Sequence, residues 1–241
     1  MINITPDCVQ QLYNSGMTIR TLADVPAEKS PDESIVAHFS DGLSMKFAKE
    51  EIIIQGYEEP EGVYLIKSGF VKAYSISPGG QHNLLLIHKA GEFIPLPWAL
   101  DGGHATGLFY EAMTDVTALR ASKDKLRGAM GNNTWLSQEI MNQTVNIVSV
   151  YTQRIQTLEY RTARERVIAE MIYIAERFGE REDGEIVINV PITHQDIADS
   201  INMSRETASR ALGLLFDDGL MGQKDHLFTI INIHKLQEAL S

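Results

Sequence analysis

Two arginines and one glutamate stand at helical spacing in the segment SRETASRAL, which runs from Ser204 to Leu212. Guanidinium groups form paired hydrogen bonds with O6 and N7 of guanine, and a carboxylate can accept a hydrogen bond from N4 of cytosine. A helix over this segment has an apolar face, and its opposite face carries polar residues. The polar face consists of Arg205, Glu206, Ser209, Arg210 and Gly213. These residue types predict that the helix binds in a DNA major groove and contacts base edges there.

Hydroxyl groups gather at the start of the same helix. Ser204 and Thr207 lie where free backbone N–H groups favour an anion, and Ser209 follows on the polar face. We therefore take Ser204, Thr207 and Ser209 as candidate phosphate contacts. An isolated Arg-Glu pair is more often a solvated helix face, so the interpretation depends on the surrounding elements.

Those elements have the spacing of a helix-turn-helix. Thr193 and Asp196 can cap a first helix that begins near His194, and Ser204 can cap the second helix. Asn202 and Met203 separate the two, which leaves a turn of three or four residues. Gly219 ends the second helix, and a two-stranded wing turning at Lys224–His226 follows, before a short helix over Ile233–Leu240 that Asn232 caps.

The segment SRETASRAL resembles the recognition helix of the cyclic-AMP receptor/fumarate-nitrate reductase regulator (CRP/FNR) family, whose pattern is close to SRET-x-x-R. The resemblance implies that Arg205, Glu206 and Arg210 contact bases and that the hydroxyls contact phosphates. It also implies a homodimer on double-stranded DNA, with half-sites similar to TGTGA in an inverted repeat. Gly213 departs from the family, because many members carry lysine there; this loss of a phosphate contact flattens the expected salt dependence.

Short apolar runs punctuated by glycine extend from Gly42 to about Ala121, which is typical of an antiparallel barrel or sandwich with a hairpin turn at Pro78–Gly80. The segments FAKEEIIIQG, VYLIKSGFVKAY and KAGEFI resemble the β-roll of the cyclic-nucleotide-binding type found in the family. The expected fold class is therefore α+β, with an N-terminal antiparallel β-roll, a long dimerisation helix and a C-terminal winged helix-turn-helix.

The ligand signature of that roll is incomplete. Gly91–Glu92 matches the Gly-Glu pair of nucleotide-binding members, but Thr106–Gly107 falls where their Arg-Ser or Arg-Thr would grip the cyclic phosphate. A buried anion without a cationic partner is costly, which argues against cyclic AMP in the usual pose. The segment Phe93–Leu100 either lines an apolar pocket for an unidentified effector or plugs a disused cavity. The candidate pocket residues are Glu92, Phe93, Trp98, Thr106, Ile147, Val148, Tyr151 and Thr152.

A segment without glycine or proline runs from Asn133 to Tyr160 and predicts a long amphipathic helix. Its apolar stripe is near heptad spacing, and by resemblance it is the dimerisation helix, whose first half touches the effector pocket. We expect a sensor domain over residues 1–131, the dimerisation helix over 132–160 and the DNA-binding domain over 161–241. We also expect the first 40 residues to form an extension with a short helix near Pro6–Ser15.

Charge and composition limit the function further. The 241 residues carry a net charge of −11. From Arg161 onward there are 9 Lys+Arg and 14 Asp+Glu residues, a net charge of −5. DNA binding must therefore rely on positive charge focused at the recognition helix, with weak non-specific affinity. No apolar run approaches the roughly 18 residues of a membrane span, and the first residues lack a signal segment, so we expect a soluble cytoplasmic protein without membrane contact.

The cysteine and histidine content predicts no cofactor. A single cysteine, Cys8, excludes an internal disulfide and a four-cysteine metal or iron–sulfur site within one chain, and the seven histidines lack the spacing that places two metal ligands on one helix face. Two rival hypotheses remain: a cupin-like metal enzyme using His82, His88, His104 and Glu92, and an interaction module that no longer binds DNA. Transcription activation would require a surface for RNA polymerase, which residue types alone do not locate.

Overall fold

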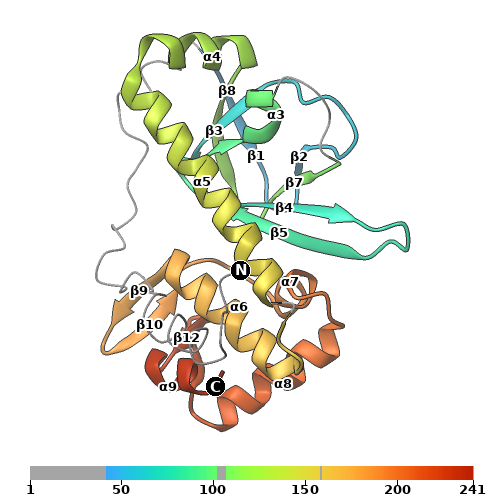
Figure 1. The fold of residues 1–241 in the computed structure, drawn as a ribbon, viewed down its shortest axis with the longest axis vertical. Coiled ribbons are helices and arrows are strands. Elements are labelled where there is room, and N and C mark those ends of the chain that lie inside the picture. The colour runs from blue at the N-terminus through green and yellow to red at the C-terminus, as the bar shows by residue number, and fades with distance from the viewer. Residues whose placement is uncertain (1–41, 102–106, 158, 241) are drawn as a thin grey trace, which may run out of the picture.

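The computed structural model describes residues 42–101, 107–157 and 159–240 (Figure 1). The predicted helix near Pro6–Ser15, together with Cys8, His104 and Thr106, lies outside these residues. The upper part of Figure 1 holds two antiparallel sheets with short helices, and the lower part holds a helical domain with a small sheet. Helix α5, Thr134–Thr157, runs from one part to the other.

The N-terminal part is built from two four-stranded antiparallel sheets, which we call the sensor roll together with α3 (Leu96–Asp101) and α4 (Lys123–Asn132). One sheet has the order β1-β8-β3-β6 and the other β2-β7-β4-β5. The strands are β1 Leu43–Phe47, β2 Ile52–Ile54, β3 Val63–Ser68, β4 Val71–Ile76, β5 His82–His88, β6 Phe93–Ile94, β7 Phe109–Ala112 and β8 Val116–Ala121. The α+β class and the antiparallel roll are thus confirmed.

Glycines mark the tight turns of the roll. In the β4–β5 hairpin, Gly80 has a φ of 78° and donates its backbone N–H to the carbonyl of Ser77 at 2.9 Å, as the Pro78–Gly80 motif predicts. Apolar side chains from both sheets fill the space between them. These include Tyr64, Ile66, Val71, Ala73, Leu86, Ile94, Tyr110 and Ala118, all buried.

Helix α5 buries only one of its faces. Leu136, Ile140, Gln143 and Val150 are buried against neighbouring elements. Larger apolar residues on another face are exposed: Met141, Val145, Val148 and Ile155, with exposed fractions of 63%, 54%, 58% and 68%. The predicted long amphipathic helix is confirmed, and it leaves an uncovered apolar stripe within the single chain.

The elements from α6 onward form what we call the C-terminal domain. Its helices are α6 Ala163–Phe178, α7 His194–Ser200, α8 Arg205–Asp217 and α9 Ile233–Glu238. A four-stranded sheet of order β11-β12-β10-β9 contains β9 Gly179–Glu182, β10 Glu185–Ile188, β11 Met221–Lys224 and β12 Leu227–Ile230. The expected wing is confirmed as β11–β12, and Asn232 caps α9 as predicted.

The C-terminal domain packs directly on the sensor roll. One apolar cluster contains Leu84, Ile87 and Met113 from the roll together with residues of α6, α7, α8 and β10. Phe70 meets Phe178 edge to face, with ring centroids 5.9 Å apart. Helix α7 also lies against β5. The burial of this shared apolar surface holds the C-terminal domain, including α7 and α8, in one position relative to the roll.

Candidate nucleic-acid interface

The two helices that carry the candidate DNA contacts begin at well-formed caps. In the capping box of α7, Thr193 Oγ1 accepts from the Asp196 N–H at 3.1 Å, and Asp196 Oδ2 accepts from the Thr193 N–H at 2.9 Å. Ser204 Oγ accepts from the Thr207 N–H at 3.2 Å at the start of α8. Between them Asn202 has a φ of 53°, a left-handed value that asparagine tolerates. The predicted helix-turn-helix is confirmed.

Helix α8 divides into the two faces expected from the sequence. Ala208, Ala211, Leu212 and Leu215 are buried against the C-terminal core. Arg205, Glu206 and Arg210 are exposed, and neither arginine forms a salt bridge or side-chain hydrogen bond with another described residue. We call these three residues the recognition face. The two guanidinium groups are open to solvent, while the Glu206 carboxylate accepts a hydrogen bond from the Ser204 hydroxyl. Side chains that read base edges must be exposed in this way.

The start of α8 also controls the charge of Glu206. The pKa of Glu206 is lowered by the backbone N–H at the helix start, by the Ser204 hydroxyl and by the charges of Arg205 and Arg210. The carboxylate is therefore ionised at neutral pH. An ionised carboxylate only accepts hydrogen bonds, which suits an amino group on a base edge and disfavours a phosphate.

The three candidate phosphate ligands have different surroundings. Ser204 is exposed, and its Oγ lies 3.0 Å from Thr207 Oγ1 at the open end of the helix. Ser209 is half-buried, and its Oγ lies 2.8 Å from Nδ1 of His194 in α7. The structure therefore places Ser204 and Thr207 together, whereas Ser209 already has a partner that ties α8 to α7. This second interaction was not foreseen from the sequence.

The tip of the wing carries one ion pair. Lys224 Nζ lies 2.8 Å from Glu182 Oε2 on β9, and hydrogen bonding to that carboxylate raises the pKa of Lys224. The positive charge of the wing is thus partly neutralised by a neighbour within the domain. This leaves the recognition face as the principal positive surface of the helix-turn-helix.

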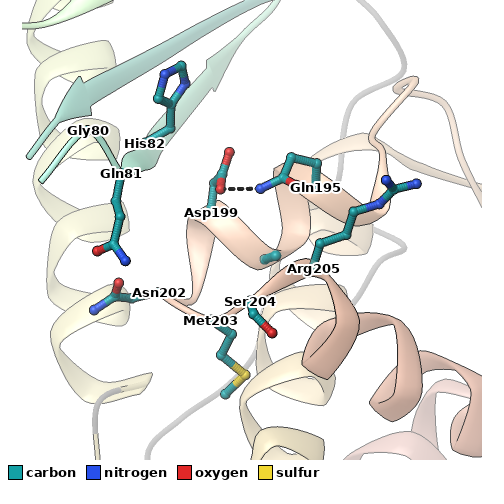
Figure 2. A pocket seen from close by; sticks show the side chains of 10 residues that line it. Gly80, Gln81, His82, Gln195, Asp199, Asn202, Met203, Ser204 and Arg205 are labelled. Atoms are coloured by element: carbon teal, nitrogen blue, oxygen red, sulfur yellow. Dashed lines mark hydrogen bonds between the residues drawn. The ribbon is translucent and has the colours of Figure 1, made fainter.

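A cleft separates the β4–β5 hairpin tip from the helix-turn-helix (Figure 2). It has a volume of about 560 Å³. Gly80, Gln81 and His82 form one wall, and Ser204 and Arg205 lie on the other with the side chains of α7. Ser204 and Arg205, two of the candidate DNA contacts, therefore line the same cleft as the hairpin tip. No local pattern in the sequence indicates this approach, because it joins segments more than 100 residues apart.

Among the described residues, the part of the candidate effector pocket near Glu92 is nearly closed. Near Glu92 a cavity of about 20 Å³ is lined by His88, Glu92, Phe93, Gln143, Asn146, Ile147 and Arg177. This volume suits about one water molecule. The Glu92 carboxylate does not point into open space, because it is paired with His88 and with Arg177 of α6.

The other predicted pocket residues do not converge on one cavity. Phe93 and Trp98 are 1% and 4% exposed in an apolar cluster with Leu136 and Ile140 of α5. Ile147 and Tyr151 pack against the roll, but Val148 is 58% exposed and Thr152 is exposed too. The structure thus brings Glu92, Phe93 and Ile147 together and separates them from Val148 and Thr152 within one chain.

The metal ligands of the rival enzyme hypothesis are only partly together. His88 and Glu92 are in contact, while His82 stacks on Tyr74 at a centroid distance of 4.8 Å. Over residues 42–101, 107–157 and 159–240, no group of three His, Cys, Asp or Glu side chains could hold a metal ion. Within the same ranges, no helix is long and apolar enough to cross a membrane.

Two family models match the chain. Residues 44–133 match the model described as a cyclic nucleotide-binding domain, and residues 165–239 match that of a Crp-like helix-turn-helix domain. Together they cover more than half of the chain and correspond to the sensor roll and the C-terminal domain.

Curated relatives align over most of the chain. Electron transport regulator A of Shewanella oneidensis is 28% identical over 190 residues, which is 78% of this chain and 74% of the relative. The fumarate and nitrate reduction regulatory protein of Vibrio cholerae is 25% identical over 190 residues, 79% of this chain and 75% of the relative. A CRP-like cAMP-activated global transcriptional regulator of Mycobacterium tuberculosis is 25% identical over 166 residues, 69% of this chain and 74% of the relative.

Solved structures share the fold at lower sequence identity. A CooA mutant from Carboxydothermus hydrogenoformans aligns with a TM-score of 0.75 and 19% identity, covering 89% of this chain and 97% of the other. FixK2 from Bradyrhizobium japonicum aligns with a TM-score of 0.69 and 23% identity, covering 82% of this chain and 96% of the other. At these identities the similarity supports the architecture alone.

Proposed function

Because this chain belongs to the CRP/FNR family of transcription regulators, we propose that its recognition face reads an inverted DNA repeat as part of a homodimer. The proteins it matches are transcription regulators and not enzymes. The observation that carries the proposal is the joint exposure of Arg205, Glu206 and Arg210 over a buried opposite face of α8. Both guanidinium groups on that face are free to meet a base edge.

The proposed half-site comes from the resemblance of the recognition face to that of the family. Arg205 and Arg210 supply two guanidinium forks for guanines, and the ionised Glu206 supplies an acceptor for a cytosine amino group. These contacts are compatible with the TGTGA half-site that the family resemblance implies. Ser204 and Thr207 would bind the adjacent phosphate at the start of α8. Ser209 would contact phosphate only while it also holds His194.

The proposed homodimer is supported by the uncovered stripe of α5. Met141, Val145, Val148 and Ile155 follow each other at intervals of four, three and seven residues, which places them along one seam of a two-stranded coiled coil. A second copy would cover the stripe and set two recognition helices about one DNA turn apart. Val148 and Thr152 would then face the partner, which accounts for their separation from Glu92.

We further propose that the sensor roll does not bind cyclic AMP in the usual pose. The cavity near Glu92 has room for about one water molecule, and the Glu92 carboxylate is already held by Arg177. An effector of another kind would act by binding two dimer arrangements with different affinities. A sensor pocket permanently filled by Phe93 and Trp98 is the second candidate, favoured by their near-complete burial. As a regulator of this type, the protein would act in the cytoplasm and could contact RNA polymerase.

The test is a comparison of two single-arginine variants. Arg205→Ala removes one fork of the recognition face, whereas Arg181→Ala removes an exposed arginine of β9 in the same domain. Fluorescence anisotropy on a TGTGA inverted repeat, and on duplexes substituted at each base, should show a loss of about 1–3 kcal/mol for Arg205→Ala with relaxed preference at one base. Equal DNA affinity and equal base preference of the two variants would contradict the role of Arg205 as a base contact.

A further inference from the structure

A buried ion pair joins the sensor roll to the last turn of α6. Arg177 Nη2 donates to Oε1 and Oε2 of Glu92 at 2.7 and 3.0 Å. The two side chains are only 16% and 19% exposed, and they are 85 residues apart in the sequence. Unlike the exposed pairs of the molecule, this one spans the boundary between the roll and the C-terminal domain in a partly dry environment. Water therefore screens it little.

Neighbouring groups complete the surroundings of the pair. His88 Nδ1 lies 2.8 Å from Glu92 Oε2, and Arg177 Nη1 donates to the Tyr173 hydroxyl at 3.3 Å. Lys89 Nζ donates to the Arg177 carbonyl at 3.4 Å. Each charge is thus satisfied from within the protein. Removing Arg177 would leave the Glu92 charge with only His88 and Lys89 near it, and removing Glu92 would leave Arg177 with only the Tyr173 hydroxyl. Either single loss is more unfavourable than losing the pair as a whole.

Helix α5 is connected to the backbone on both sides of Glu92 through Gln143. The Gln143 amide nitrogen donates to the Gly91 carbonyl at 2.9 Å, and its oxygen accepts from the Phe93 N–H at 3.0 Å. Gln143 is itself buried, at 8% exposed. Because both neighbours of Glu92 are held by one side chain of α5, a shift of that helix must move the Glu92 carboxylate relative to Arg177.

Two further contacts hold α7 at its two ends. Lys72 of β4 lies 3.5 Å from Asp196, the capping residue of α7. Arg154 of α5 donates to the Ser200 carbonyl at the other end of α7 at 2.7 Å and to the Leu85 carbonyl of β5 at 2.8 Å. The first helix of the helix-turn-helix is therefore mounted on the roll and on α5, and its setting follows from theirs.

We infer that Glu92 and Arg177 form an interdomain latch, which positions the C-terminal domain and which Gln143 couples to α5. In this arrangement the Glu92 carboxylate binds Arg177 of the C-terminal domain and does not bind an effector. The inference rests on the proposed function, because positioning matters for a recognition helix that must reach DNA. An effector or a dimer rearrangement that moves α5 would release or tighten Arg177 and so alter the setting of α8.

The latch is tested by hydrogen exchange on the full chain. Glu92→Gln and Arg177→Gln each leave one buried charge unpaired, and the double variant removes both. Glu61→Gln is the matched control, because Glu61 forms an exposed ion pair with Arg120 on the roll. Each single variant should speed amide exchange in the last turns of α6 by roughly tenfold or more, with the double variant no faster than the faster single variant. The latch would be overturned if the effects of the two single variants on the exchange rate added up in the double variant. It would also be overturned if each single variant exchanged at the rate of Glu61→Gln.

Thermal unfolding identifies any variant that does not fold. In that case Arg177→Lys keeps the positive charge but loses the two-oxygen contact, and it should still speed exchange in α6 more than Glu61→Gln does. An exchange rate for Arg177→Lys equal to that of the control would count against the latch.

DNA affinity provides a second readout that separates the two proposals. On the TGTGA duplex, both single variants should change the dissociation constant in the same direction by roughly tenfold or more, since both release one contact. Opposite directions, or no change beyond that of Glu61→Gln, would overturn the coupling of the latch to recognition. If the wild-type chain has no sequence preference at all, the proposed function fails, and hydrogen exchange still decides whether the latch exists.

Discussion

The recognition face and the Glu92 site use the same kinds of side chain in opposite ways. On α8, two guanidinium groups and a carboxylate point outward, and the arginines have no ion-pair partner among the described residues. At the roll boundary, Arg177 and Glu92 satisfy each other in a nearly buried setting. The exposed charges of α8 are accessible to an external ligand, whereas the paired charges of Arg177 and Glu92 join two parts of the protein. Geometry, and not residue type, separates the two roles.

The largest expected contrast is in stability. Arg177→Ala leaves the buried Glu92 with the His88 contact but without its ion-pair partner in α6, which should lower the free energy of unfolding by up to about 3–5 kcal/mol. Arg210→Ala removes an exposed group and should change it by less than about 0.5 kcal/mol. Urea unfolding of both variants at one protomer concentration provides the measurement. Equal losses in the two variants would remove the distinction between the two sites.

Acid should weaken the buried site selectively. Burial alone would raise the pKa of Glu92, but the Arg177 charge and the His88 contact outweigh it and lower the pKa to about 2. A carboxylate whose pKa is lower in the folded state stabilises the fold fully at pH values above its unfolded pKa of about 4.3. This stabilisation is lost as the pH falls through the folded pKa. At neutral pH the contribution of Glu92 to the free energy of unfolding is about 3 kcal/mol.

The measurement is the difference in unfolding free energy between the wild type and Glu92→Gln at pH 5, 4 and 3. This difference should shrink steadily as the pH falls. A difference that stays constant down to pH 3 would show that the folded protein does not lower the pKa of Glu92.

A smaller effect is expected on the recognition face itself. Gly213 lies on α8 with no atom within 4 Å of the position of a Cβ, so Gly213→Lys introduces a cation without a clash. One added phosphate contact should steepen the slope of log K against log salt by about 1, with little change in base preference. Anisotropy titrations at several salt concentrations measure the slope. An unchanged slope would place Gly213 away from the DNA backbone.

Local signals made the C-terminal domain predictable. Caps at Thr193 and Ser204, the apolar face of α8 and the wing turn are all set by residues within a few positions of each other. For the same reason the glycine-punctuated strands indicated an antiparallel roll. The roles of Arg205, Glu206 and Arg210 as base contacts remain predictions, because the structure shows their exposure and not their partner.

The sequence alone does not indicate the contacts between residues that lie far apart in the chain. The Gly-Glu motif predicts that Glu92 lines an effector pocket, and no local pattern indicates Arg177 as its partner. Likewise, Ser209 meets His194, and the hairpin tip faces Arg205, only after the chain has folded. Residue spacing reports on neighbours along a helix or strand, whereas contacts between domains depend on how finished elements pack.

The central claim is that the recognition face reads an inverted repeat. It is tested most directly by fluorescence anisotropy of the wild-type chain on a TGTGA inverted-repeat duplex and on a scrambled duplex of equal length, at two salt concentrations and without cyclic AMP. We predict clearly tighter binding to the repeat at both salt concentrations. Equal affinity for the two duplexes at both salt concentrations would contradict the claim.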